Sequence, residues 1–178
     1  MVFALAALAP AVARAADPPS CLGGGCDGGT ILPDEIPADA PRFADYPARV
    51  VPITRPAPAK IVGAQRWFRT RLREGAERGP NFAGHYTLAT WGCGAGCVSW
   101  AVIDAVTGRV FDTSNMATTQ NFNVADELAQ HTVQYRLDSR LLVVIGEINE
   151  NPKMRGISYF VWTGAQLDRV RFIAHPEP

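Results

Sequence analysis

Apolar and polar residues follow a two-residue period through much of the chain after residue 81, as in half-buried β-strands. Val133, Tyr135 and Leu137, for example, alternate with polar neighbours. Such runs, or short unbroken apolar runs typical of better-buried strands, occur at Tyr86–Trp91, Val98–Ile103, Val133–Leu137, Leu141–Ile145, Ile157–Trp162 and Leu167–Ile173. With a return strand that begins at Val110, the pattern predicts about seven strands.

One helical pattern precedes these strands. Phe68, Leu72 and Ala76 recur every fourth residue within Ala64–Glu77, which places them on one apolar face of a helix. The glycine-proline pair that follows stops the helix. We therefore predict an α+β fold that is mainly β, an antiparallel meander sheet of about seven strands with one N-terminal amphipathic helix.

Turn-forming residues separate the predicted strands. Asp104-Ala-Val-Thr-Gly-Arg109 is typical of a hairpin turn with Gly108 in the left-handed region. In the polar stretch after Phe111, Val124–Gln130 has the composition of a short helix with Asn123 as its N-cap. Short connections of this kind favour antiparallel neighbours, because parallel strands need longer crossovers.

Composition divides the chain of 178 residues into three parts. Residues 1–15 are apolar and end in Ala13-Arg14-Ala15, which fits the cleavage rule of a signal peptide, although the usual basic n-region is missing. Residues 16–60 are rich in proline and glycine and predict an extended or flexible segment. Residues 61–178 are expected to form a single β-rich domain.

The signal-like segment predicts a periplasmic or secreted protein. No run of apolar residues approaches the ~20 residues that a transmembrane helix needs, so we expect no transmembrane segment. The 17 basic and 17 acidic residues balance to a net charge of zero, which argues against nucleic acid as a partner.

Four cysteines occur as two closely spaced pairs, Cys21 with Cys26 and Cys93 with Cys97. In an exported protein such pairs predict disulfides, and three pairings are open, including two local loops or two bridges between the pairs. Glycines around Cys93 and Cys97 allow the tight turn that a disulfide needs, so a staple between strands is the first interpretation. A thiol-redox role, or a soft-metal site completed by His85, is the alternative.

Three short motifs carry a resemblance: Asn81-Phe-Ala-Gly-His-Tyr86, Trp91-Gly-Cys-Gly-Ala-Gly-Cys97 and Asp104-Ala-Val-Thr-Gly108. Together with the preceding helix, they resemble a family of small secreted or periplasmic bacterial proteins that are largely uncharacterised. The similarity extends from about Arg66 to Trp162. The resemblance implies an exported protein of one domain and assigns no activity and no catalytic residue.

His85 is the strongest candidate for a catalytic residue, because an imidazole with an unperturbed pKa of ~6.5 suits proton transfer. Asp104 is its candidate carboxylate partner, although Asp104 also suits the first position of the hairpin turn. Ser99 lacks the Gly-x-Ser-x-Gly context of a hydrolase nucleophile. A hydrolytic enzyme built on these residues would therefore lack a complete catalytic set.

Aromatic and arginine residues supply the candidate binding surface. Trp91 and Trp100 flank the cysteine loop, and aromatic rings offer a large contact area, although such residues are also common in cores. Arg66 and Arg69 lie on one face of the predicted helix, where guanidinium groups pair well with a carboxylate or phosphate. A merely solvated face is the simpler interpretation of these arginines.

The sequence contains no phosphate-binding loop and no dinucleotide fingerprint, and its ligand spacing predicts no metal and no cofactor. The prediction is an exported, non-enzymatic binding or interaction module in the cell envelope, with an unknown protein or small molecule as its ligand. The alternative is a thiol-redox or hydrolytic enzyme, or a metal-binding protein, that uses His85 with Cys93 and Cys97.

Overall fold

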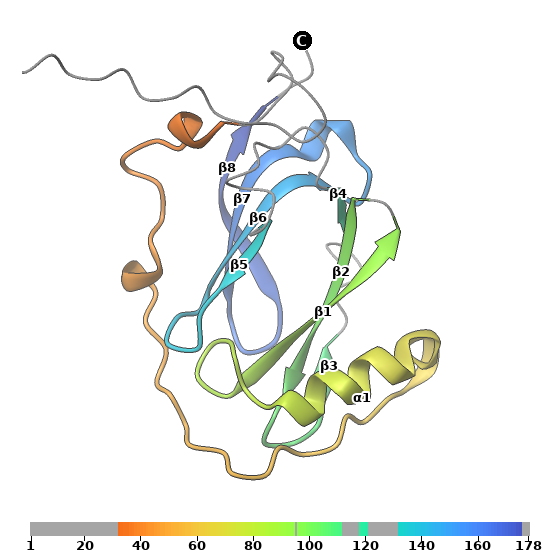
Figure 1. Ribbon diagram of the computed structural model, residues 1–178. Coiled ribbons are helices and arrows are strands. Elements are labelled where there is room, and N and C mark those ends of the chain that lie inside the picture. Colours follow the sequence, from red (N-terminus) through yellow and green to blue (C-terminus); the bar gives the residue numbers. More distant parts are fainter. Residues whose placement is uncertain (1–31, 95, 112–117, 121–131, 176–178) are drawn as a thin grey trace, which may run out of the picture.

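The computed structural model describes residues 32–94, 96–111, 118–120 and 132–175, and this part of the chain is mainly β with one α-helix (Figure 1). The helix is α1 (Arg69–Arg78), and short 3-10 helices cover η1 (Pro33–Glu35), η2 (Phe43–Asp45), η3 (Gly63–Phe68) and η4 (Pro152–Met154). The strands are β1 (Tyr86–Gly94), β2 (Cys97–Asp104), β3 (Val110–Phe111), β4 (Thr118–Gln120), β5 (Val133–Tyr135), β6 (Leu141–Ile148), β7 (Arg155–Trp162) and β8 (Leu167–Ala174).

The strands form two antiparallel units. β1, β2 and β3 make a three-stranded unit, and β5, β6, β7 and β8 make a four-stranded unit. The short strand β4 pairs with β2 and with β6, so it links the two units at their edges. The mainly β, antiparallel character of the prediction is confirmed. The prediction of a single meander sheet is not confirmed, because two facing layers are needed to bury the apolar faces of these strands.

The main hydrophobic core lies between the two units. Leu88 of β1 and Trp100 and Val102 of β2 meet Leu142 and Phe160 from β6 and β7, and all of these side chains are buried. In Figure 1 the two groups of strands face each other across this core. Alternate residues of each strand point away from this core, so the apolar side chains on the outer face of each unit must be buried by other segments of the chain.

Helix α1 covers the outer face of the three-stranded unit (Figure 1). Leu72 and Ala76 pack there against Ala89 and Ile103. The predicted helix at Ala64–Glu77 begins later than expected, because its first turn and a half is the 3-10 helix η3. A 3-10 helix has three residues per turn, so the i, i+4 spacing no longer brings the first apolar residue onto the buried face.

An extended segment, the N-terminal strap (residues 32–62), runs along the outside of the molecule and appears in orange in Figure 1. Ile36, Phe43 and Tyr46 of the strap pack on the outer face of β6 and β7, and Ile61 joins the layer beneath α1. The strap therefore covers apolar surface of both strand units. The predicted signal segment 1–15, Cys21, Cys26 and the predicted helix Val124–Gln130 lie outside the described residues.

Backbone hydrogen bonds tie the strap to the loops of the domain. The carbonyl of Tyr46 accepts a bond from the amide of Arg140 at 2.8 Å, and the amide of Val51 donates to the carbonyl of Gly84 at 3.0 Å. Farther along, the amide of Lys60 donates to the carbonyl of Gly108 at 2.7 Å. The strap thus reaches two of the sequence motifs, the loop before β1 and the β2–β3 turn.

Two glycines make this close approach possible. Gly84 has φ +88° and Gly108 has φ +76°, both in the left-handed region that favours glycine, as predicted for Gly108. A Cβ atom at Gly84 would collide with the carbonyl oxygen of Arg49, and one at Gly108 with that of Pro58. Both positions therefore need glycine for their backbone angle and for the space that the strap occupies.

Candidate functional site

His85 lies immediately before β1, on the wall of a surface pocket of about 390 Å³. The loop that carries it is anchored on both sides. The amide of Leu88 donates to Oδ1 of Asn81 at 2.7 Å, Nδ2 of Asn81 donates to the carbonyl of Leu88 at 3.2 Å, and Phe82 is fully buried. These contacts position His85 at the surface, with 29% of its side chain exposed.

Asp104 lies beside His85, but the two side chains are not hydrogen-bonded. Nε2 of His85 and Oδ1 of Asp104 are 3.9 Å apart, which is beyond hydrogen-bond distance. The carboxylate instead accepts bonds from the amide of Val106 at 2.8 Å and from the hydroxyl of Thr107 at 2.7 Å. Asp104 is therefore held in place by the hairpin turn.

These turn contacts also set the ionisation of Asp104. Partial burial by itself would raise the pKa of its carboxyl, but the bonds from Thr107 and Val106, helped by nearby His85, outweigh that effect and lower the pKa. The carboxylate therefore remains ionised at neutral pH, and its strongest partners are groups of its own turn.

The rest of the pocket comes from three separate segments. Arg49 belongs to the strap, Arg140 to the turn between β5 and β6, and Trp162 and Gly164 to the end of β7 and the turn after it. Among the described residues that line the pocket there is no serine, cysteine or acidic side chain. The hydroxyls among these lining residues belong to Tyr86 and Thr163, and the pocket has the groups to hold a ligand.

The second cysteine pair forms a disulfide at the far end of the β1–β2 hairpin. Cys93 and Cys97 are bonded, with their Cα atoms 5.2 Å apart, which confirms the local staple for this pair. The strand register shifts between Gly92 and Gly94, and Gly94 pairs with Cys97 at the hairpin tip. The glycines around the pair allow the turn that brings the sulfur atoms together.

The disulfide and His85 lie at opposite ends of β1. Tyr86, next to His85, pairs with Asp104 at one end of the hairpin, and Gly94 pairs with Cys97 at the other. Eight residues of extended strand span about 26 Å, so His85 and the cysteines do not share a site. No group of three or more histidine, cysteine or acidic side chains that could hold a metal ion occurs in the described ranges.

Three exposed or partly exposed rings gather beside the disulfide. Trp67 is 87% exposed and Phe68 is 48% exposed, and the ring of Phe68 lies 5.3 Å from that of Trp91. With Arg71 and Cys93 they line a shallow pocket of about 410 Å³. We call the surface of Trp67, Phe68 and Trp91 the aromatic surface. Sequence reasoning placed Phe68 on the apolar face of the helix, with Trp67 beside it, whereas both residues lie in the 3-10 helix η3 and are exposed.

The other predicted binding residues separate into two groups. Arg66 and Arg69 are exposed and belong to the same stretch of chain as Trp67 and Phe68. Trp100 is only 1% exposed and lies in the core between the two strand units, so it cannot contact a ligand at the surface. The structure thus brings Trp91, Arg66 and Arg69 to the surface and removes Trp100 from it.

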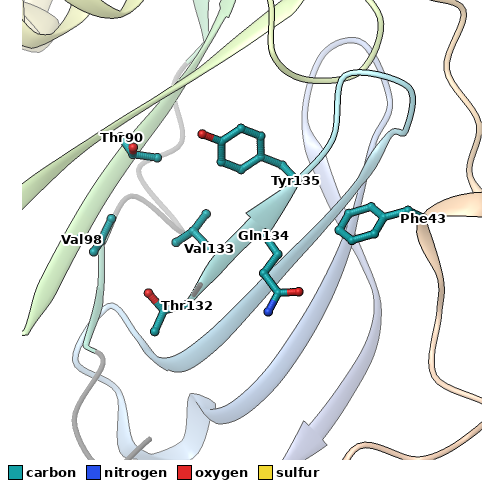
Figure 2. Close-up of a pocket in the computed structure, with 7 residues that line it drawn as sticks. All are labelled: Phe43, Thr90, Val98, Thr132, Val133, Gln134 and Tyr135. Atoms are coloured by element: carbon teal, nitrogen blue, oxygen red, sulfur yellow. The ribbon is translucent and has the colours of Figure 1, made fainter. Parts of the chain in front are cut away.

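A cavity of about 690 Å³ opens between the two strand units (Figure 2). Thr90 of β1 and Val98 of β2 form one wall, and Val133 and Tyr135 of β5 face them from the other. No charged side chain occurs among the described residues that line it. This cavity therefore gives apolar and hydroxyl contacts, without a group that would select an ionic ligand.

Comparison of the chain with protein-family models, curated proteins and solved structures gave no match. In the described part of the chain, no helix has the length and apolar character needed to cross a membrane. The functional argument therefore rests on the geometry of the His85 pocket and of the aromatic surface.

Proposed function

We propose that this chain is an exported, non-enzymatic interaction module of the cell envelope that binds a protein partner through the aromatic surface. The exposure of Trp67 is the observation that carries this proposal, because 87% of this large side chain is in contact with solvent. Tryptophan and other aromatic residues are enriched at the energetic centres of protein interfaces. A partner that covers Trp67 and Phe68 would remove their apolar area from water.

The surface is also held rigidly, which favours binding. Trp91 belongs to β1 close to the Cys93–Cys97 disulfide, and Phe68 ends η3 directly before α1. The opposite face of α1 is buried against the strands, so the helix cannot turn its exposed side away. A preorganised surface loses less conformational entropy when a partner binds.

The charges beside the aromatic surface indicate the chemistry of the partner. Arg66 and Arg69 are exposed and flank Trp67 and Phe68 in the chain. A guanidinium group at the rim of an interface favours a partner that carries carboxylates and disfavours a basic one. The partner we expect presents an apolar side chain surrounded by acidic residues.

The location in the envelope is supported by the disulfide. The Cys93–Cys97 bond is of the kind that persists in oxidising compartments outside the cytosol. The predicted signal segment and the resemblance to small secreted bacterial proteins agree with this location. A periplasmic or secreted protein is therefore part of the proposal.

A photo-crosslinking experiment in the native host tests this function. A photoreactive phenylalanine analogue is placed at Trp67, and in a matched control at Val106, which is 57% exposed on the turn at the other end of the hairpin. We expect one discrete protein adduct from position 67, weakened by Arg66→Glu and Arg69→Glu. Equal adducts from both positions, or none from position 67, would contradict the proposal.

A further inference from the structure

We propose that the pocket beside His85 binds a small organic anion, a carboxylate or phosphate carried on a flat apolar group, between Arg49 and Arg140. The pocket lies at the end of β1 opposite the disulfide, so it is a second site, separate from the aromatic surface. Its residues come from the strap, the loop before β1, the β5–β6 turn and the turn after β7. Only the folded chain brings them together.

The two arginines are held by their backbone, while their guanidinium groups remain available. The amide of Arg140 donates to the carbonyl of Tyr46 at 2.8 Å, and the carbonyl of Arg140 accepts from the amide of Trp162 at 2.9 Å. The strap carbonyl of Arg49 lies against Gly84. Neither guanidinium group has an ion pair or hydrogen bond to any described residue. The backbone of each arginine is therefore fixed, and the N–H groups of its guanidinium remain available to a ligand.

The surface arginines of this chain differ in their pairing. Four of them pair with a nearby carboxylate at 2.8 to 3.2 Å, namely Arg42 with Asp45, Arg71 with Glu74, Arg136 with Asp138 and Arg171 with Asp39. Arg49 and Arg140, like Arg66 and Arg69, have no such partner in the described part of the chain, and they differ from those two in lining one pocket together. Guanidinium groups match carboxylate and phosphate oxygens through two parallel hydrogen bonds.

The electrostatic environment of the pocket favours an anion. His85 adds a third group that can carry positive charge, and the described lining residues include no acid. The nearest carboxylate to His85, that of Asp104, is already engaged by the amide of Val106 and the hydroxyl of Thr107. Because the ionised carboxylate of Asp104 does not line the pocket, a ligand carboxylate or phosphate would meet two guanidinium groups there.

The base of the pocket favours a flat apolar group on the ligand. The rings of His85 and Tyr86 are 4.2 Å apart and inclined by 33°, and the ring of Trp162 lies 5.2 Å from that of Tyr86. Aromatic faces and edges of this kind pack well against another flat ring. A volume of about 390 Å³ is within the range of small-ligand sites.

Trp162 adds a polar group to the residues that line the pocket. Its side chain is 1% exposed, and its indole N–H has no hydrogen-bond partner among the described residues. A buried donor without an acceptor is costly and rare in folded proteins. An oxygen atom of a ligand that reaches the base of the pocket would satisfy this donor.

Calorimetric titration of the full chain tests the proposal with four probes. Benzoate and phenyl phosphate carry both features of the ligand, benzamide is the uncharged counterpart of benzoate, and acetate lacks the ring. We expect benzoate or phenyl phosphate to bind with at least about tenfold higher affinity than benzamide and acetate. Equal affinity for benzoate and benzamide, or no binding by either charged aromatic probe at millimolar concentration, would overturn the proposal.

Substitutions then place the binding in the pocket. Arg49→Gln and Arg140→Gln keep the backbone bonds, and each should weaken binding of the charged aromatic probe by about tenfold, with no detectable binding in the double variant. Arg66→Gln, an exposed arginine at the aromatic surface, is the matched control and should bind as the unchanged protein does. If the two pocket variants bind the probe as tightly as this control does, the probe does not bind between Arg49 and Arg140. Comparison of benzoate with benzamide on the unchanged chain keeps the proposal falsifiable if a variant does not fold.

Discussion

Gly84 lies against the carbonyl oxygen of Arg49, with no room for a side chain between them. The strap can approach the loop before β1 only because position 84 is a glycine, and the φ of +88° at this residue adds a second reason. This contact also determines where Arg49 sits beside His85. A change at Gly84 should therefore affect both stability and the pocket.

We expect Gly84→Ala to lower the free energy of unfolding by about 2–4 kcal/mol, from left-handed strain and from the collision with the strap. Gly92→Ala is the matched control, because a Cβ there has no atom within 4 Å, and it should change stability by less than about 1 kcal/mol. Urea unfolding of both variants measures the difference. Equal stabilities would show that the strap does not rest on Gly84.

Helix α1 packs on β1 through a second small-residue contact, between Gly75 and Ala89. A Cβ at position 75 would collide with the side chain of Ala89. Although alanine is the better helix former, we expect Gly75→Ala to destabilise the fold by about 1–3 kcal/mol, because the collision with Ala89 costs more than the gain in helix propensity.

A double-mutant cycle separates the two effects at this contact. In an Ala89→Gly background the space for the new methyl group is present, so Gly75→Ala should cost at least about 1 kcal/mol less than it does alone. Unfolding in urea of the four proteins gives the coupling. Additive effects would contradict the proposed packing of α1 on β1.

The Cys93–Cys97 disulfide closes a short loop, with a sequence separation of 4. Because the entropy removed from the unfolded chain is small for short loops, we expect Cys93→Ser with Cys97→Ser to cost about 2 kcal/mol. The experiment uses a background in which Cys21 and Cys26 are serine, so that a reductant acts on one pair only. Reduction should then lower the free energy of unfolding of this background protein by the same amount. It should leave the stability of the variant that also carries Cys93→Ser and Cys97→Ser unchanged.

Asp104 should make stability depend on pH. Because the pKa of its carboxyl is lowered from 3.8 in the folded protein, the ionised group stabilises the fold above that value, and this contribution disappears as the pH falls through the folded pKa. We expect Asp104→Asn to cost about 1–2 kcal/mol at pH 7 and progressively less below about pH 4.

Denaturation of the Asp104→Asn variant and the parent between pH 7 and pH 2 measures this difference. Glu77→Gln on the exposed side of α1 is the control and should stay within about 0.5 kcal/mol of the parent at pH 7. A constant difference across the pH range would mean that the charge of Asp104 contributes nothing to stability.

Local structure was the part that hydrophobic patterning predicted well. The runs at Tyr86–Trp91, Val98–Ile103 and Ile157–Trp162 correspond to β1, β2 and β7 with small differences at the ends. The left-handed Gly108 followed from turn chemistry, and the glycines favoured a staple of Cys93 and Cys97 among three open pairings. These features depend on residues close together in the chain, which is why the sequence is informative about them.

The candidate site was harder to predict because it combines distant segments. Periodicity indicates that a strand has an apolar face, but it does not say which layer covers that face. Trp100 therefore looked like a binding residue and is in the core, while Phe68 looked like a core residue and is 48% exposed. Arg49 carried no local signal for its place beside His85.

The sequence by itself determined that this chain is mainly β, that a helix precedes the strands, and that Gly108 shapes a hairpin. For the second cysteine pair it favoured a local staple and left the pairing open. Only the tertiary structure decided that the strands divide into two facing units, that the strap crosses Gly84, and that Arg49 and Arg140 meet at the His85 pocket. The physical reason is that turns and strand faces depend on neighbouring residues, whereas a pocket depends on which distant surfaces pack together.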